Sequence, residues 1–299
     1  MGNKEKIGFI INPKSGTRTK ENIPQLIEEI IDHDRFEISV KYTQCAGHGI
    51  KIANDMAKEG CTMVVAVGGD GTVNEVAQSL LHTNSALAII PGGSGNGLAR
   101  HLRIPLNVKD ALKLINNCKI VEIDHGTAND VAFFCTCGVG FDAHIGHEFS
   151  KQKTRGFFTY LKSILGEFMK YKPKKYKLKT QKEKISKRAF LVTFANASQY
   201  GNNAYIAPHA DIQDGKIDVC ILQPFPVHKA IEIGRRLLSK KINDSKYVDI
   251  IQTNEISIKR KRKDVFHFDG EPCIMKKKIV VKAHKGGLKV AVLVNSNLK

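Results

Sequence analysis

The stretch that decides the fold reads Val-Val-Ala-Val-Gly-Gly-Asp-Gly-Thr-Val-Asn-Glu-Val and covers residues 64–76. Its β-branched residues favour a strand that stops at 68–69, and the apolar period after Thr72 predicts a helix. Thr72 and Glu75 have the spacing of a capping box at the start of that helix. The order strand, glycine loop, helix predicts a backbone cradle for a phosphate group. Because Asp70 in this loop would repel a bare phosphate, the pattern favours a nucleotide carried with Mg²⁺.

The rest of the N-terminal part alternates short apolar runs with amphipathic segments, which predicts β-α units around a parallel sheet. The predicted strands lie at 6–12, 36–42, 62–67 and 87–90. The helix that follows the last of these strands has Asn107 as its N-cap.

A polar or glycine-rich turn follows each of these strands. The four turns are Asn12 to Gly16, Thr43, Gly68 to Thr72, and Pro91 to Gly97. Since ligands bind beyond the carboxyl ends of parallel strands, we expect the turns to converge on one binding site. Lys14 and the Ser15 hydroxyl would donate to phosphates there. Ser94 and Asn96 would add side-chain hydrogen bonds.

After Asp124 the pattern changes to short alternating runs between turn signals, which predicts an antiparallel β-sandwich. The predicted strands lie at 131–137, 189–195, 217–222, 247–251, 255–260, 264–268, 278–283 and 288–294. A helical insert at about 157–169 interrupts them.

The 299-residue chain has a formal net charge of +18, which limits the kinds of partner it is expected to bind. Such an excess favours an anionic partner: nucleic acid, lipid headgroups or a nucleotide. The basic stretches at 170–188 and 259–263 are either solvated faces or surfaces that dock on anionic lipid. Aromatic residues make up only 7%, and Trp is absent, which disfavours nucleic acid. No apolar run is long enough to span a bilayer, and no signal-peptide core is present, so we expect a cytoplasmic protein with peripheral membrane contact.

Three features of the second part each have a structural and a functional interpretation. Asp269-Gly270 before Glu271 is typical of a hairpin turn, or it presents Glu271 as a general base. The acidic cluster of Asp211, Asp214 and Asp218 is a solvated hairpin or a site for a hard cation. Asp142 lies in a Gly- and Phe-rich turn, where it is a turn residue or a substrate contact.

Five segments together resemble the diacylglycerol kinase catalytic family, which includes bacterial soluble lipid kinases, sphingosine kinases and ceramide kinases. In family order they are Asn12-Pro-Lys-Ser-Gly16, Gly68-Gly-Asp-Gly-Thr-Val-Asn-Glu75, Pro91-Gly-Gly-Ser-Gly-Asn-Gly-Leu-Ala-Arg100, Gly140-Phe-Asp-Ala143 and Asp269-Gly-Glu271. Gly-Gly-Asp-Gly-Thr alone would also suit NAD kinases and resembles the phosphofructokinase loop. The set of five is specific to the lipid-kinase branch.

The resemblance implies a two-domain enzyme. An N-terminal α/β domain of three layers, with the parallel sheet of the NAD kinase and phosphofructokinase type, would bind ATP and cover 1–124. A C-terminal antiparallel β-sandwich domain at 125–287 would take the lipid substrate. The last strand, at about 288–299, would return to the first domain. Family members are often dimeric, so a homodimer is also expected.

The resemblance also implies roles for individual residues. ATP contacts would come from Asn12, Thr43, Gly68, Gly69, Asp70, Gly71, Thr72, Asn74 and Ser94, beside the Lys14, Ser15 and Gly16 turn. Glu271 would accept the proton of the acceptor hydroxyl, while Asp70 would organise Mg²⁺ and water or share the base role. Asp211 and Asp214, with the carbonyl of Lys216, would match a structural Mg²⁺ loop. Asn96, Arg100 and Asp142 are candidate substrate contacts.

One departure concerns the acceptor. Diacylglycerol-specific bacterial members tend to have Asp after Asn in the fourth turn, whereas this chain has Gly97 after Asn96. The local Gly-Ser-Gly-Asn is more similar to the sphingosine and ceramide kinase pattern. Two other functions stay open: an NAD kinase-like phosphotransferase on a soluble acceptor, and a non-catalytic nucleotide- or lipid-binding relative.

Overall fold

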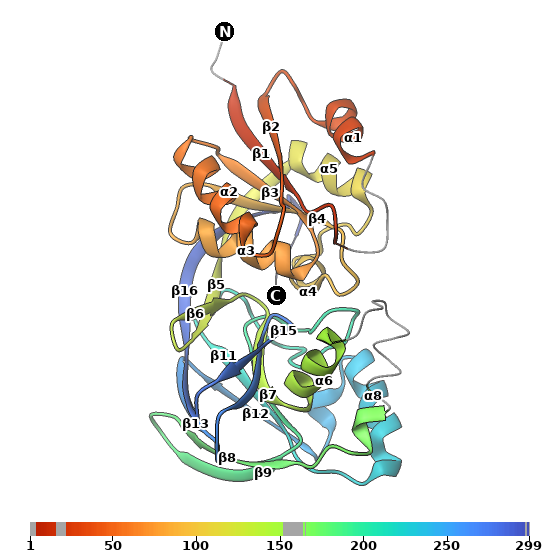
Figure 1. Cartoon of the computed structure of the whole chain (residues 1–299), viewed down its shortest axis with the longest axis vertical. Helices are drawn as coiled ribbons and strands as arrows, with labels where there is room; N and C mark the ends of the chain where they lie inside the picture. The colour runs from red at the N-terminus through yellow and green to blue at the C-terminus, as the bar shows by residue number, and fades with distance from the viewer. Residues whose placement is uncertain (1–3, 16–21, 152–163, 165, 297, 299) are drawn as a thin grey trace. The chain divides into compact units, whose positions relative to one another are not determined.

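The computed structural model describes residues 4–15, 22–151, 164, 166–296 and 298 (Figure 1). The chain forms two compact units, which are described separately. Unit 1 contains Met1–Ile123 and Gly286–Leu298, and unit 2 contains Asp124–Lys285. Two strands, β5 (Cys118–Ala128) and β16 (Lys278–Leu293), contribute residues to both units.

Unit 1 is built on a parallel sheet with the strand order β2-β1-β3-β4. Its strands are β1 (Glu5–Ile11), β2 (Phe36–Tyr42), β3 (Met63–Gly68) and β4 (Ala86–Pro91). The end of β16 extends the sheet, because Val290 pairs with Leu87 of β4 in parallel register. Every residue of β3 and β4 is buried, as expected for central strands covered on both faces.

Helices cover both faces of this sheet and make unit 1 a three-layer α/β structure (Figure 1). The two pairs are α1 (Ile23–Ile30) with α5 (Val108–Asn116), and α2 (His48–Lys58) with α3 (Asp70–Leu80). A short helix α4 (Gly97–His101), which the sequence did not predict, follows the fourth turn. Asn107 caps α5 as predicted, since its side chain accepts from the backbone N–H groups of Lys109 and Asp110.

The predicted capping box at Thr72 and Glu75 is wrong. Helix α3 already begins at Asp70 and has no side-chain cap. Glu75 instead reaches the N-terminus of α2, where Oε1 accepts from Gly47 N at 2.7 Å and Oε2 from Gly49 N at 3.0 Å. The spacing was right for a cap, but the free N–H groups of the neighbouring helix satisfy the carboxylate.

We expect Glu75→Gln to destabilise unit 1 by about 1–2 kcal/mol, because an amide can accept at only one of these two positions. Glu59→Gln is the matched control, since that side chain is 57% exposed and lies 3.5 Å from Lys41. Chemical denaturation of both variants measures the difference. Equal midpoints for the two variants would refute the capping role.

Unit 2 contains two antiparallel sheets, which confirms the predicted β-sandwich. One has the order β12-β11-β10-β7-β14-β15, and the other contains β16, β13, β8 and β9. The first sheet is formed by β7 (Thr136–Gly140), β10 (Leu191–Ala195), β11 (Ile217–Leu222), β12 (Val248–Thr253), β14 (Asp264–Phe268) and β15 (Glu271–Met275). The second adds β8 (Lys174–Lys179), β9 (Lys184–Ala189) and β13 (Glu255–Lys259), and β6 (Val131–Phe133) pairs with β5.

Two hydrophobic clusters organise unit 2. The first fills the space between the sheets and includes Phe194, Phe266 and Ile258. The second lies on the other face of the β7-containing sheet, where helices α6 (Phe141–Ser150) and α8 (Ala230–Leu238) pack. Two 3₁₀ turns, η1 (Val227–Lys229) and η2 (Ile242–Asp244), flank α8.

Several strand predictions need correction. The runs at 278–283 and 288–294 are parts of one strand, β16, and the run at 131–137 is split between β6 and β7. The lysine-rich tract, in which no strand was predicted, forms the hairpin β8–β9, because Tyr176 and Leu178 alternate inward between exposed lysines. The helical insert predicted at 157–169 falls mostly outside the described residues. Within this range, residues 164 and 166–168 are described as helical.

Candidate active site

The four predicted turns of unit 1 converge at the carboxyl edge of the parallel sheet, which confirms their expected placement. Asn12 N donates to Val67 O at 3.1 Å, and Gly92 N donates to Gly68 O at 2.7 Å. The buried Thr43 donates its N–H to Ile11 O at 3.0 Å. The parallel register of β1 with β2 and β3, and of β3 with β4, produces this convergence.

The first turn is tied to helix α3 by a side-chain hydrogen bond. Asn12 Nδ2 donates to Thr72 Oγ1 at 3.0 Å, while Asn12 Oδ1 accepts from Lys14 N at 3.0 Å. The Ser15 hydroxyl donates to Asn12 O at 3.2 Å. Asn12 therefore organises both the turn and its contact with the glycine loop. Gly16, also predicted to bind nucleotide, lies outside the described residues.

The two glycine loops touch each other through their backbones. A Cβ on Gly93 would lie 2.7 Å from Gly69 Cα and 3.0 Å from Asn96 Oδ1. A Cβ on Gly69 would lie 3.3 Å from Gly93 Cα. The third and fourth turns can pack this closely only because neither residue carries a side chain.

We expect Gly93→Ala to cost about 1–3 kcal/mol of stability and to weaken nucleotide binding, since the methyl group meets backbone that cannot move aside cheaply. Gly69→Ala is the matched comparison, because its added methyl makes only a tight contact. Thermal denaturation with and without ADP measures both effects. If the two alanine variants behave alike, the close approach of the loops does not control this site.

Asp70 links the same two loops with its carboxylate. Oδ2 accepts from Asn96 N at 2.9 Å, and Oδ1 accepts from Gly97 N at 2.6 Å. Asn96 has φ +51° and closes its own turn, with Oδ1 accepting from Gly93 N and Nδ2 donating to Gly93 O. Asp70 thus caps α4, and the contact at residue 97 needs only a backbone N–H. Gly97 supplies this N–H as well as an aspartate at position 97 would.

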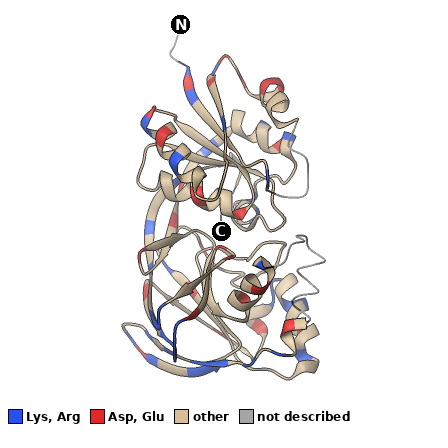
Figure 2. Ribbon diagram, in the orientation of Figure 1, with Lys and Arg blue, Asp and Glu red and all other residues tan. Residues whose placement is uncertain are grey.

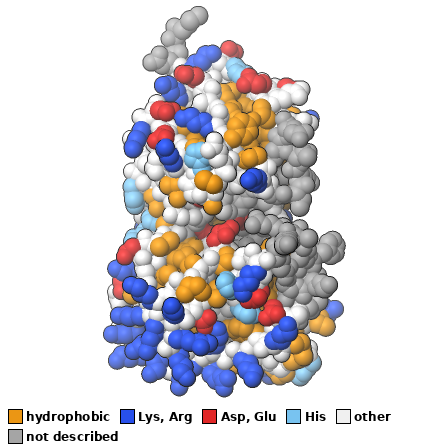
Figure 3. Space-filling view, in the orientation of Figure 1, with side chains coloured by type: hydrophobic (Ala, Val, Ile, Leu, Met, Phe, Trp, Pro, Cys, Tyr) orange, Lys and Arg blue, Asp and Glu red, His pale blue; other side chains and the backbone are white. Residues whose placement is uncertain are grey.

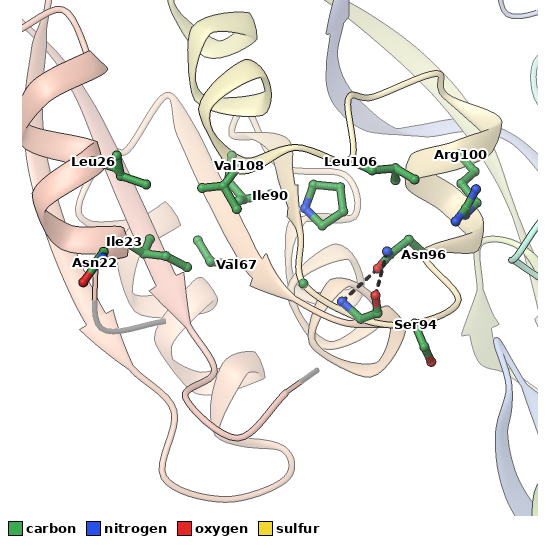
Figure 4. A pocket seen from close by; sticks show the side chains of 13 residues that line it. Asn22, Ile23, Leu26, Val67, Ile90, Ser94, Asn96, Arg100, Leu106 and Val108 are labelled. Carbon is green, nitrogen blue, oxygen red and sulfur yellow. Dashed lines mark hydrogen bonds between the residues drawn. The ribbon is translucent and has the colours of Figure 1, made fainter. Parts of the chain in front are cut away.

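A hollow of about 350 Å³ adjoins the fourth turn (Figure 4). Both apolar and polar residues line it. The apolar residues are Ile23, Leu26, Val67, Ile90, Pro91, Leu106 and Val108, and the polar ones include Asn22, Ser94, Asn96 and Arg100. Arg100 Nε donates to Gly95 O at 3.0 Å. Asn74, the remaining predicted nucleotide contact, accepts a hydrogen bond from Gln78 within α3.

In unit 2, Glu271 opens β15 directly after a tightly anchored hairpin turn. Asp269 and Gly270 both have positive φ, at +47° and +89°, as a type I′ turn requires. The Asp269 carboxylate accepts from the backbone N–H groups of Phe134, Cys135 and Thr136 at 2.8–2.9 Å. The predicted hairpin is therefore real, and it presents Glu271 as an exposed side chain beside a fixed turn.

Asp142, at the start of α6, is the centre of a buried polar cluster. Its Oδ2 accepts from Thr193 Oγ1 at 2.8 Å, Tyr200 OH at 3.2 Å and His267 Nε2 at 3.2 Å. The Asp142 side chain is 10% exposed and that of His267 3%. Burial raises the pKa of Tyr200 well above its usual range, so its hydroxyl stays protonated and donates. Because α6 packs on β14 and β15, this cluster lies near the turn that carries Glu271.

The acidic loop of unit 2 is held mainly by backbone hydrogen bonds. Asp211 Oδ1 accepts from Gln213 N and Asp214 Oδ1 from Lys216 N, both at 2.9 Å, while Asp124 Oδ2 accepts from Gly215 N at 2.6 Å. Asp218 is buried, which raises the pKa of its carboxyl group. In the part of the chain that the structure describes, no three His, Cys, Asp or Glu side chains form a metal-binding group. The Mg²⁺ loop, which would use two carboxylates and the Lys216 carbonyl, stays a prediction.

Comparison with known proteins decides the family. Residues 6–134 match the family described as diacylglycerol kinase catalytic domain. Residues 135–291, more than half of the chain, match the YegS C-terminal NAD kinase beta sandwich-like domain. The chain belongs to the diacylglycerol kinase and YegS family. The protein is thus a lipid kinase of this family, an ATP-using phosphotransferase.

Similarity to individual family members extends over most of the chain. A "Diacylglycerol kinase" of Bacillus subtilis is 27% identical over 271 residues, which are 88% of each chain. A "Probable lipid kinase YegS-like" of Chromohalobacter salexigens is 26% identical over 89% of this chain and 86% of its own. The crystal structure of a diacylglycerol kinase from Bacillus anthracis matches with a TM-score of 0.74 at 21% identity and covers 97% of each chain. This last likeness establishes the shared fold.

Sequence reasoning missed several residues that shape the site of this lipid kinase. Asp124, Thr193, Tyr200 and His267 hold backbone or carboxylate groups in place, yet none lies in a pattern that points to its partner. The pattern around Glu75 pointed to its own helix instead of α2. Their partners are distant in sequence, so only the fold identifies them. None of the helices within the described residues is long and apolar enough to cross a membrane.

Proposed function

We propose that this lipid kinase transfers the γ-phosphoryl group of Mg²⁺-ATP to a hydroxyl group of a membrane lipid, such as a diacylglycerol, a sphingoid base or a related lipid. The observation that supports it most is the backbone contact of the two glycine loops, which Asp70 bridges at 2.6 and 2.9 Å. Glycine loops at a helix start bind phosphates through their N–H groups. Family membership supplies the class of acceptor.

In this proposal the loops of unit 1 position the triphosphate. Asn12, Thr43, the 68–72 loop and Ser94 bind it, with Lys14 and Ser15 as further donors. The site fits a hard cation because Asp70 places a carboxylate where the two glycine loops meet, and carboxylate oxygens are ligands that Mg²⁺ prefers. Mg²⁺ at this position would neutralise charge on the phosphate oxygens. Positioning and electrostatics then account for most of the rate.

We assign the proton transfer to Glu271. As the lipid oxygen bonds to the γ-phosphorus, the bond from phosphorus to the ADP oxygen breaks, and the hydroxyl proton passes to the Glu271 carboxylate. The rigid turn at Asp269 supports this role, since an anchored turn keeps the following side chain in place. Asn96, Arg100 and Asp142 remain candidate contacts to the acceptor.

The acceptor lies in a bilayer, so we further propose peripheral contact with anionic lipid on the cytoplasmic side. The charge of +18 favours this contact. Lys and Arg residues are frequent along β9, β8, β13 and β16 (Figure 2), and basic side chains gather on the surface in this part of unit 2 (Figure 3), which we call the lysine face. Several basic residues lie directly opposite one another on neighbouring strands. The pairs are Lys175 with Arg188, Lys179 with Lys184, Lys177 with Lys259, and Lys259 with Lys278. Like charges directly opposite are destabilising, and the arrangement gives the chain a positive field that attracts it toward anionic surfaces.

Incubation with labelled ATP and mixed micelles tests the reaction. The panel contains diacylglycerols, long-chain bases and, as a soluble acceptor, NAD. We expect label in one class of extracted lipid, which mass spectrometry then identifies. Label in NAD with none in lipid would establish the soluble-acceptor alternative. Thermal stabilisation by Mg²⁺-ATP without any transfer would establish a non-catalytic relative.

A further inference from the structure

Helix α8 carries an apolar stripe on its solvent side, opposite the side that packs into unit 2. Ile233 is 4% exposed and packs in the second hydrophobic cluster, with Leu237 against it. On the outer side, Val227 is 57% exposed, Ile231 71% and Leu238 61%. The spacing of four and seven residues places these three side chains along one side of η1 and α8. A helix with large apolar side chains on both sides is unusual unless a partner covers the outer one.

A fourth exposed apolar side chain lies near the start of this stripe. Met169 is 69% exposed and follows Phe168, whose ring centroid is 5.8 Å from that of Phe225. Phe225 is two residues before Val227. Lys170 and Lys172, next along the chain, are exposed as well. We call Met169, Val227, Ile231 and Leu238 the α8 ridge.

Basic side chains flank the ridge with little acidic charge to balance them. From 227 to 241 the chain has five Lys or Arg residues and one acid, Glu232. Glu232 is already shared by Lys229 at 2.9 Å and Arg236 at 3.0 Å. Among the described residues, Arg235, Lys240 and Lys241 form no ion pair. Apolar tips between exposed cations are the combination that binds an anionic bilayer surface, where the tips enter the acyl boundary and the cations meet headgroup phosphates.

The position of the ridge within unit 2 favours the same partner. Helices α6 and α8 cover one face of the same sheet, and both contribute to the second hydrophobic cluster (Figure 1). Helix α6 begins beside Asp142 and packs against the strands that carry the Glu271 turn. The lysine face belongs to the other sheet and points away from this side. Since a flat bilayer can touch only one of these two faces, we propose that the α8 ridge, and not the lysine face, docks unit 2 on anionic membrane.

This proposal rests on the proposed function, because docking would bring the enzyme to a lipid acceptor. Its test measures membrane binding and does not depend on phosphoryl transfer. The chain has no Trp, so a single introduced Trp reports on its own surroundings without background. Ile231→Trp places the reporter on the ridge, and Lys177→Trp places the matched control on the lysine face. Both are mixed with vesicles of phosphatidylcholine, with or without phosphatidylglycerol, and brominated acyl chains are used to quench inserted Trp.

We expect a blue shift and quenching for Ile231→Trp with the phosphatidylglycerol vesicles, and neither for Lys177→Trp. The reverse pattern, or no response from either reporter, overturns the proposal. An equal response with vesicles of pure phosphatidylcholine would show that the basic residues beside the ridge do not contribute to membrane binding. A blue shift that grows with protein concentration in the absence of vesicles shows that a second copy of the chain covers the ridge instead.

A second variant keeps the test independent of the reporter. Replacing Ile231 and Leu238 together by serine should weaken vesicle binding at least tenfold in a flotation assay. Phosphorylation of a short-chain acceptor dispersed as monomers should stay unchanged, because the ridge lies outside the proposed catalytic machinery. Unchanged vesicle binding refutes docking, whereas absence of phosphorylation in the unmodified protein would refute only the proposed function.

Discussion

Replacing Glu271 by glutamine is expected to lower kcat for the lipid acceptor by about 10²- to 10⁴-fold, the usual loss when a positioned general base is removed. Glutamine keeps the shape and leaves the Asp269 turn intact, because that turn is held by Asp269 and the backbone of 134–136. The affinity for ATP should stay close to normal, since the nucleotide contacts that we propose are all in unit 1. Steady-state kinetics with ATP and lipid varied separately measures the two effects.

Glu183→Gln provides the matched control for this variant. Glu183 is also an exposed carboxylate of unit 2, in the turn between β8 and β9, and its backbone is held by Thr180. It should keep full activity and the same melting temperature. A Glu271→Gln enzyme with near-normal kcat would remove Glu271 from the base role and leave Asp70 as the remaining candidate.

Asp70→Asn should weaken nucleotide binding and lower activity by about 10²-fold, because the third and fourth turns would no longer be held in register. The carboxylate accepts N–H groups of Asn96 and Gly97 at once, whereas the amide would direct an N–H donor at one of these donors. Loss of a hydrogen bond to a charged group costs about 1.5–3 kcal/mol, so unit 1 should also melt at a lower temperature. Isothermal titration with ADP and thermal denaturation test both parts of the prediction.

Asp110→Asn is the control for Asp70, because Asp110 also lies in the first turn of a helix of unit 1 but is 59% exposed. That variant should bind ADP normally. If Asp70→Asn loses activity while stability and ADP affinity stay unchanged, the carboxylate acts on the metal or the proton alone and its structural role is minor. Normal activity of Asp70→Asn would refute both roles.

Much of the fold and part of the site could be predicted from the sequence because the relevant signals are local. Apolar periodicity predicted the order of strands and helices in unit 1, and the parallel sheet required by that order brings the four turns to one edge. Asp269-Gly270 predicted its own hairpin, since few other residues adopt two successive left-handed conformations. The lysine hairpin β8–β9 was missed because charge masked the alternation of Tyr176 and Leu178.

The sequence by itself determined the two kinds of sheet, the glycine loops and the position of the Glu271 turn. Turn conformation and the period of apolar side chains depend on residues that are close in the sequence. Only the tertiary structure decided which donors each carboxylate meets. Glu75 could have capped its own helix but caps α2, and Asp70 closes a loop that begins more than twenty residues later. A carboxylate takes whichever free N–H groups the packed fold brings near, and that proximity exists only after distant segments have come together.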